Sequence, residues 1–346
     1  MKRFIGFVAL AFLIVTVASQ TWVLGQDKVE RRDKKAGSVN VSGKILEENP
    51  GGVRIKPQGL GKEETIPSSD ILRVTYADLP AQASLEIGKM ATAETERNYP
   101  VLLKGYEGIQ AMPAVKSSPA PARRYIDYRV VSLRGFVAEG DDQLKAAAKG
   151  LSDFMAANAD SWEYPHAARQ LARLQADMGD YAGAAKTYQE IKKAAAVPAE
   201  FKQEATAALI DLAFQSENYA AGEARVKEIL ADANAPAALK ARADMYQLGL
   251  EGAKGDLAAT VKKIEEAIAK SNDPSLKALA YNVLGDVYLA KKQKRDAMWS
   301  YLWVDQVYNQ DRGEHLKAMT RLIKIFEEDK DEEKVKLFKE KLARSR

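Results

Sequence analysis

The sequence of 346 residues predicts a mainly α-helical fold, an α-solenoid of six or seven helical hairpins preceded by a small all-β module. Three observations lead to this prediction. A turn followed by a helix recurs at a nearly constant spacing, and prolines recur at the same spacing. Between residues 37 and 78, hydrophobic residues alternate with polar ones as they do in strands. These patterns divide the chain into residues 1–25, 26–36, 37–78 and 80–346.

The recurring turn is clearest in Met178–Ile191, whose sequence is MGDYAGAAKTYQEI. With Tyr181 as its marker, the counterparts follow about every 38 residues, at Tyr219, Leu257 and Lys294. A second series has the same period, because Pro198, Pro236 and Pro274 recur at this interval. Two independent series at one period indicate an internal repeat.

Each repeat contains two amphipathic helical segments that meet at the marker turn. In one copy, Tyr281, Leu284 and Tyr288 fall on a single helix face. Gly285 lies among them, although glycine destabilises a helix interior by about 1 kcal/mol relative to alanine. A close approach of the partner helix explains its place, and the small Ala297 on that partner helix has the same explanation. Proline ends each second helix, since it cannot continue the hydrogen-bond ladder.

These residues resemble the tetratricopeptide repeat (TPR) family. One copy of the family signature is Tyr281, Leu284, Gly285, Tyr288, Ala297 and Tyr301, and a second is Leu171, Ala172, Gly179, Asp180, Tyr181, Ala184 and Tyr188. The family's usual period is about 34 residues, and the period here is somewhat longer. The resemblance covers residues 80–346 and is strongest over 161–305. It implies a non-catalytic scaffold that binds a protein or peptide partner.

The resemblance also implies where the partner lies, on the concave face built from the first helix of each hairpin. Carried onto this sequence, the partner-binding positions are His166, Arg169, Arg173, Asp177, Glu204, Asp211, Phe214, Gln215, Asn282, Asp286 and Leu289. Arg169 and Arg173 are four positions apart on one helix, so both can face a single acidic group. The alternative interpretation is that these are ordinary solubilising side chains.

The β module has strand and turn signals in a regular order. Val39, Val41 and Ile45 alternate with polar residues, and the turn residues 49–52 (NPGG) separate this run from a second alternating run at 53–55. A short strand at 64–66, one helical turn at 67–70 and a last strand at 71–76 complete the module. The order resembles an SH3-like or Sm-like barrel. So small a sheet is marginal alone, and we expect it to pack on the first helices.

The N-terminal residues 1–25 have the pattern of a signal peptide. Lys2 and Arg3 precede an apolar run from Phe4 to Val17, and small residues follow. The alternative is an uncleaved anchor formed by residues 4–24. Either way we expect an exported protein, periplasmic or extracellular, with membrane contact only through this segment. Residues 26–36 are charged without apolar periodicity and predict a solvated linker.

Two segments of the helical region depart from the repeat. Residues 111–122 (AMPAVKSSPAPA) are rich in proline, alanine and serine and predict a loop. Residues 327–346 are highly charged and predict a solubilising capping helix, with Val335, Leu337, Phe338 and Leu342 as its apolar contacts. The tryptophans Trp162, Trp299 and Trp303 are expected in the core or between repeats, with a ligand platform as the alternative.

Several function classes are disfavoured by what the sequence lacks. There is no cysteine, and the two histidines, His166 and His315, lie about four repeats apart, so we expect no transition-metal site and no cofactor. No nucleophile motif or phosphate loop occurs. The net charge of +4 is small and forms no basic stripe, which argues against nucleic acid. Two alternatives to the protein-binding scaffold remain: an assembly factor for envelope glycan or outer-membrane components, and an enzyme with a cleft between the β module and the array.

Overall fold

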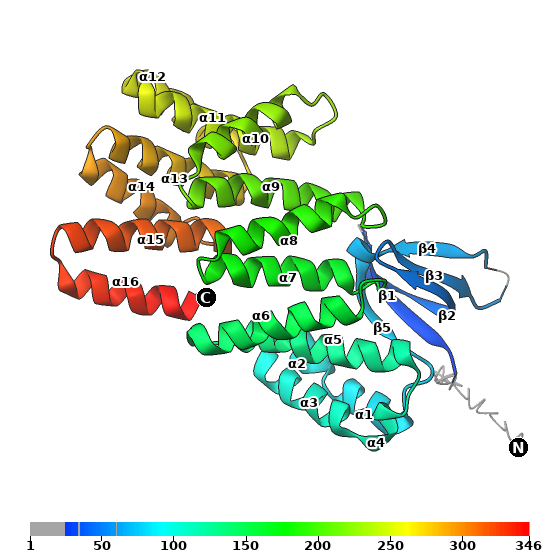
Figure 1. The fold of residues 1–346 in the computed structure, drawn as a ribbon. Helices are drawn as coiled ribbons and strands as arrows, with labels where there is room; N and C mark the ends of the chain where they lie inside the picture. The colour runs from blue at the N-terminus through cyan, green and yellow to red at the C-terminus, as the bar shows by residue number, and fades with distance from the viewer. Residues whose placement is uncertain (1–24, 34, 60, 346) are drawn as a thin grey trace, which may run out of the picture.

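The computed structural model describes residues 25–33, 35–59 and 61–345. A small sheet lies beside a curved array of helices, next to α6, α7 and α8 (Figure 1). The predicted signal peptide or anchor lies outside the described residues, apart from Gly25. No helix in the described part of the chain is both long enough and apolar enough to span a membrane.

The sheet has five antiparallel strands in the order β4-β3-β2-β1-β5. The strands are β1 Asp27–Asp33, β2 Gly37–Asn49, β3 Gly52–Pro57, β4 Glu64–Pro67 and β5 Ile71–Thr75. The predicted helical turn is the 3₁₀ segment η1, Ser68–Asp70, and it is fixed by a 3.0 Å hydrogen bond from the Ser68 amide to the Gly51 carbonyl. The predicted order of hairpin, short strand, helical turn and last strand is therefore present, and in the described residues the ladder of the sheet ends at β4 and β5.

The predicted linker at 26–36 is wrong, because β1 occupies most of it and pairs with both β2 and β5. Val29 is its single fully buried side chain, which is why no apolar period was visible. Polar groups fix the strand instead. The Asp27 carboxylate accepts hydrogen bonds from the amides of Ile45 and Ala77, both at 2.9 Å, and Glu30 pairs with Arg73 at 2.7 Å.

The helical array confirms the predicted α-solenoid. It begins with α1 Ala81–Lys89, α2 Ala91–Glu96, α3 Tyr99–Ala111 and α4 Pro113–Lys116. Six hairpins follow, formed by α5 Ala120–Val137 with α6 Gly140–Ala157, α7 Tyr164–Asp177 with α8 Tyr181–Lys193, α9 Ala199–Gln215 with α10 Tyr219–Ala231, α11 Ala237–Lys254 with α12 Leu257–Lys270, α13 Pro274–Ala290 with α14 Lys294–Gln306, and α15 Arg312–Glu328 with α16 Glu332–Ser345.

The marker residues of the repeat each begin the second helix of a hairpin, namely α8, α10, α12 and α14. The residue before the marker caps three of these helices, because the side chains of Asp180, Asn218 and Asp256 accept a hydrogen bond from the amide three residues on. The close crossing predicted at Gly285 is also present. A Cβ atom there would lie 2.5 Å from the ring of Tyr301.

The loop predicted at 111–122 is wrong, because it contains α4 and the start of α5. Pro113 occupies the first position of α4, and Pro119 is the N-cap of α5. Proline is tolerated at these positions because the amide it lacks has no intrahelical acceptor there. The prolines therefore mark helix starts instead of a loop.

The sheet and the helices share one hydrophobic core. Buried residues of the strands, including Val53 and Ile66, continue into Tyr106, Tyr125 and Trp162 of the helical region. The expectation that the module packs on the first helices is met. Trp162 is 2% exposed, as predicted for a core residue.

The same prediction is wrong for two other tryptophans. Trp299 and Trp303, both on α14, are 53% and 48% exposed. At the C-terminus, α16 caps the array with Phe338 buried, but Leu337, predicted as an apolar contact, is 58% exposed.

The array curls until its last hairpin meets an early one (Figure 1). Arg312 at the start of α15 pairs with Asp177 at the end of α7, at 2.8 Å. Arg321 of α15 also pairs with Glu217, in the turn after α9, at 3.5 Å. These ion pairs join segments far apart in sequence and close the concave side of the solenoid.

Candidate functional site: the concave cavity

The concave side of the array encloses a cavity of about 850 Å³. Side chains of the first helices α7, α9, α11, α13 and α15 line it, together with residues from α8 and α16. Six Lys or Arg and five Asp or Glu residues are among the lining, so charges of both signs face the space. A superhelix of hairpins produces such a surface because each hairpin is rotated slightly against the last.

The wall of the cavity is held by a cluster around Arg242 of α11. Its guanidinium donates two 2.8 Å hydrogen bonds to Asp211 of α9 and a further one to Glu314 of α15. The hydroxyl of Tyr246 donates to Asp211 at 2.8 Å, and the buried Asn282 donates to Glu314 at 2.8 Å. Four first helices are therefore tied together across the concave face by one cation and its two acids.

Burial and pairing shift the protonation of this cluster. Burial by itself lowers the pKa of Arg242, but the carboxylates of Asp211 and Glu314 raise it well above its ordinary value. Burial raises the pKa of Glu314 against the opposing attraction of Arg242. The arginine therefore stays charged, and the cluster is rigid and directional.

Arg169 and Arg173 do face one acidic group, as predicted, and the acid belongs to the chain itself. Glu204 of α9 accepts from Arg169 at 3.4 Å and from Arg173 at 2.5 Å. Arg173 remains 56% exposed and lines the cavity, whereas Arg169 also lies over the ring of Phe201. An acidic group of a partner would have to displace Glu204.

The structure brings five of the predicted partner-binding residues to the cavity: Arg173, Asp177, Glu204, Asp211 and Gln215. The other six do not line it. Asn282 is fully buried and Phe214 is 7% exposed. Asp286 pairs with Lys317 at 3.1 Å, and Leu289 packs in the core beside α15.

His166, predicted as a partner-binding residue, instead helps join the sheet to the helices. One ring nitrogen, Nε2, lies 2.7 Å from the Ser68 carbonyl of η1. The ring packs at steep angles against those of Trp162 and Phe201. Burial, and then the nearby Arg169, lower the pKa of His166 to about 3. The side chain is therefore neutral and structural.

Sequence reasoning missed the contributions of α11 and α15, including Arg242, Arg312, Glu314 and Lys317. A usable signal existed for one of them, because Arg242 stands one repeat period after Glu204, at the equivalent position of the next repeat. For α15 no such signal existed, since this helix reaches the site by the curl of the array.

A second polar cluster lies where the sheet meets α5 and α7. Arg124 of α5 pairs with Glu163 at 3.0 Å and with Glu48 of β2. The Tyr76 hydroxyl donates to Glu48 at 2.5 Å and accepts from the Trp162 indole at 3.1 Å. Burial raises the pKa of Glu163 to about 7, although Arg124 opposes this. None of these residues lines the concave cavity, and the junction is packed.

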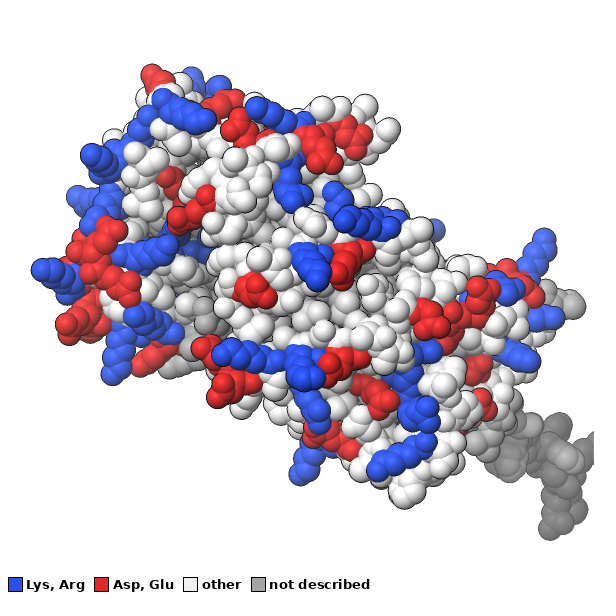
Figure 2. Space-filling view, in the orientation of Figure 1, with Lys and Arg blue, Asp and Glu red and all other residues white. Residues whose placement is uncertain are grey.

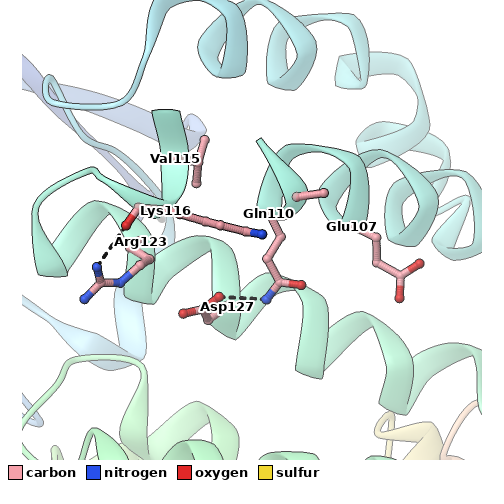
Figure 3. Close-up of a pocket in the computed structure, with 7 residues that line it drawn as sticks. Glu107, Gln110, Val115, Lys116, Arg123 and Asp127 are labelled. Atoms are coloured by element: carbon pink, nitrogen blue, oxygen red, sulfur yellow. Dashed lines mark hydrogen bonds between the residues drawn. The ribbon is translucent and has the colours of Figure 1, made fainter. Parts of the chain in front are cut away.

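A smaller cavity of about 450 Å³ lies between α3, α4 and α5 (Figure 3). The Lys116 side chain extends across it toward Gln110, whose amide donates to Asp127 at 2.7 Å. Arg123 donates to the Lys116 carbonyl at 3.2 Å. These polar groups are paired within the chain, so this cavity is a less favourable site than the concave one.

Charges of both signs are interspersed over the face of the molecule that Figure 2 shows, without an extended patch of one sign. Among the described residues, no group of three or more His, Cys, Asp or Glu side chains is placed to hold a metal ion.

The architecture has a counterpart among solved structures. It is similar to a tetratricopeptide repeat protein from Parabacteroides merdae ATCC 43184, with 16% sequence identity, a TM-score of 0.50, and coverage of 76% of this chain and 93% of that chain. The chain has a TPR-type fold. The resemblance seen in the sequence is therefore confirmed at the level of fold. No protein-family model matches the sequence, and no curated protein is significantly similar to it.

Proposed function

We propose that this TPR-type protein is a non-catalytic scaffold of the cell envelope that holds a polypeptide partner in its concave cavity. The observation that carries the proposal is the cavity itself, which five successive first helices line. Helical repeats bind partners on such extended concave surfaces, and its volume of about 850 Å³ accommodates several side chains of a bound segment.

The chemistry of the lining favours a polypeptide with polar groups of both kinds. Arg173, Lys324 and Arg312 supply donors at the cavity, and each is already near a carboxylate of the chain. Ion pairs of this kind fix the side chains before a partner arrives, which lowers the entropic cost of binding. A partner segment can form individual hydrogen bonds with these side chains. It does not need a large net charge, because the charges that line the cavity are already balanced by their neighbours.

The two alternative functions have less support. An envelope-glycan function needs exposed aromatic rings in the groove, and the aromatic residues that line the cavity are Tyr181 and Tyr188, the latter 5% exposed. An enzyme with its cleft between the sheet and the array needs an open pocket at that junction, where Glu163 and Trp162 are instead almost completely buried. We therefore retain the binding scaffold.

Blocking the cavity tests the proposal. Thr320 lines it from α15, is exposed and donates to the Leu316 carbonyl one turn before. Thr320→Trp fills part of the cavity. The matched control is Thr95→Trp on α2, where an exposed threonine makes the same kind of bond to Ala91. A photo-crosslinker at Gln215 captures the partner from envelope extracts.

We expect the same polypeptide to be captured by the wild type and by Thr95→Trp, and its yield to fall about tenfold with Thr320→Trp. Equal capture by all three proteins would refute the concave site.

Export is part of the proposal and rests on the signal-peptide pattern of residues 1–25. It is checked by fractionating cells and measuring the mass of the mature chain. A protein confined to the cytoplasm would refute the envelope role without bearing on the binding site.

A further inference from the structure

Three ion pairs connect α15 to hairpins that lie much earlier in the chain. Arg312 pairs with Asp177 of α7 at 2.8 Å, and Arg321 and Lys324 pair with Glu217, in the turn after α9, at 3.5 and 3.7 Å. All of these residues except Glu217 line the concave cavity. A repeat in a solenoid contacts its immediate neighbours, so these contacts are additional to the repeat. We call the three ion pairs the cross-cavity pairs.

No shared apolar core lies between the elements that the cross-cavity pairs connect. The buried apolar residues of α15 cluster with those of α13, α14 and α16. In the described part of the chain, neither of the clusters that contain α7 and α9 includes a residue of α15. Helices α7, α9 and α15 instead face the cavity together. The contact from one side of the cavity to the other is therefore polar.

The cross-cavity pairs are more exposed than the ion pairs of the Arg242 cluster. The side chains of Arg312, Glu217 and Lys324 are 46%, 57% and 58% exposed, whereas those of Arg242 and Glu314 are 16% and 4% exposed. An exposed ion pair shifts an equilibrium by about fivefold at most, because water and salt screen it. The Arg242 cluster therefore holds α15 beside α9, α11 and α13, and the cross-cavity pairs are the contacts that release easily.

We propose that the cross-cavity pairs form a gate on the concave cavity, which the chain's own charges close and which salt or the charged groups of an arriving partner release. This inference rests on the proposed function, since it assigns a regulation to the same site. Release needs no movement of the helices. The long side chains of Arg312 and Lys324 rotate away, Arg321 keeps a second acid, Asp286, at 3.2 Å, and the Arg242 cluster keeps α15 in place.

The strength of the gate follows from the number of ion pairs. Three exposed pairs, each contributing about fivefold at most, shift the balance between the closed and the open arrangement by up to about a hundredfold. A gate of this strength keeps the cavity closed most of the time. It is also weak enough for a polypeptide with a few charged side chains to open it.

The access of a bulky reagent to the cavity tests the gate. The chain has no cysteine, so Ala207→Cys introduces a single thiol at a position of α9 that lines the cavity. Its rate of reaction with pyrene maleimide, a bulky neutral reagent, is divided by its rate with the small N-ethylmaleimide, which corrects for the reactivity of the thiol. The gate variant adds Asp177→Asn and Glu217→Gln, which remove the acids of all three pairs.

The matched control adds Asp153→Asn and Glu223→Gln to the same Ala207→Cys protein. These two acids also pair with lysines, at 2.5 and 2.9 Å, but each lysine is one turn away on the same helix. Neither acid lines the cavity, and the change in net charge equals that of the gate variant. Circular dichroism melting confirms that all three proteins fold.

We expect the ratio of the two rates to rise at least about tenfold in the gate variant at low salt, and to change by less than about twofold in the control. The Ala207→Cys protein itself should show a similar rise between about 0.05 M and about 1 M salt, because salt screens exposed charges.

An unchanged ratio in the gate variant would overturn the gate, as would an equal rise in the control or a ratio that does not depend on salt. The measurement needs no partner. Failure of the gate therefore shows in this ratio, whereas failure of the binding scaffold shows in the capture at Gln215.

Discussion

The same polar arrangement, an arginine between two carboxylates, occurs at two places in the molecule and has a different role at each. At the junction of sheet and helices, Arg124 lies between Glu48 and Glu163, and at the concave face Arg242 lies between Asp211 and Glu314. A tyrosine hydroxyl donates to one carboxylate in each cluster. Both are an arginine shared by two acids from separate elements.

The surroundings of the two clusters differ. The junction is enclosed by aromatic rings of the shared core, and Glu163 is fully buried there. The concave cluster borders an open cavity, and Asp211 keeps 22% of its side chain exposed. The first arrangement therefore fixes one module on another, whereas the second holds four helices at a distance that leaves room for a ligand. The burial of the acids decides which role the arginine has.

The largest effect should follow from removing the junction arginine. Arg124→Met leaves Glu163 and Glu48 buried without a cation, and we expect a loss of about 3–5 kcal/mol in the free energy of unfolding. Denaturant titration measures it. Adding Glu163→Gln should recover part of the loss, because the uncompensated charge is then gone. A single variant within about 1 kcal/mol of the wild type would contradict this account.

Removing the concave arginine should cost less. Arg242→Met leaves Glu314 buried but leaves Asp211 able to hydrate, so we expect a loss of about 2–4 kcal/mol. Arg242→Lys should lie between the wild type and Arg242→Met, since lysine cannot donate to both acids in the same fork geometry. If Arg242→Met proves more destabilising than Arg124→Met in the same titration, the comparison by burial is wrong.

The stability that the junction contributes should also depend on pH. Variants of Glu163 and of His166 should separate the contributions of these two groups. The pKa of Glu163 is raised to about 7, so its contribution to stability is complete below its ordinary 4.5 and disappears as pH rises through 7. The pKa of His166 is lowered to about 3, so its contribution is present above its ordinary 6.5 and is lost as pH falls toward 3. Between about 4.5 and 6.5 the two groups act in opposite directions.

Melting temperatures from pH 7.5 to 5 test this opposition. Relative to the wild type, Glu163→Gln should be destabilised by acidification, because it lacks the group that gains stability. His166→Gln should be stabilised by acidification relative to the wild type. Between pH 7.5 and 5, the free energy of unfolding of each variant should change relative to that of the wild type by on the order of 1–2 kcal/mol, which the shift in melting temperature reports. Parallel profiles for the two variants would show that these groups do not govern the junction.

The smallest effect on stability is expected at the apolar crossing of α13 and α14, where Gly285 lies, and not at either polar cluster. In Gly285→Ala the new methyl group meets the Tyr301 ring at 2.5 Å, and we expect a net destabilisation of about 1 kcal/mol after the gain in helix propensity. The control is Gly108→Ala in α3, where nothing lies within 4 Å of the new atom, and it should be stabilising. Equal effects at the two sites would mean that the helices do not cross closely at Gly285.

The repeat was predictable because it is encoded locally. The turn residues Asp180, Asn218 and Asp256 cap helices, and the marker that follows each begins the next helix. The strand β1 was not predictable in this way. Its single buried residue, Val29, gives no alternation, and its other stabilising contacts come from residues as distant as Arg73 and Ala77.

The candidate site was predictable only in part, because part of it depends on contacts between residues that are distant in the sequence. The position of each residue within the sequence repeat predicts that Arg173, Glu204 and Asp211 lie on first helices, and these residues do line the cavity. It also placed His166 and Asn282 there, although one packs on the sheet and the other is buried under α15. A repeat position specifies a face of one helix, but what covers that face depends on the neighbouring modules.

The sequence by itself determined the hairpin unit, its nearly constant period and the direction of each helix face, because caps, prolines and apolar spacing act within about one turn or one hairpin. Only the tertiary structure decided how far the array curls, which brings Arg312 to Asp177 and α15 into the cavity wall. It also decided that Trp299 and Trp303 remain exposed. Small rotations between successive hairpins add up over the array, and no local pattern records their sum.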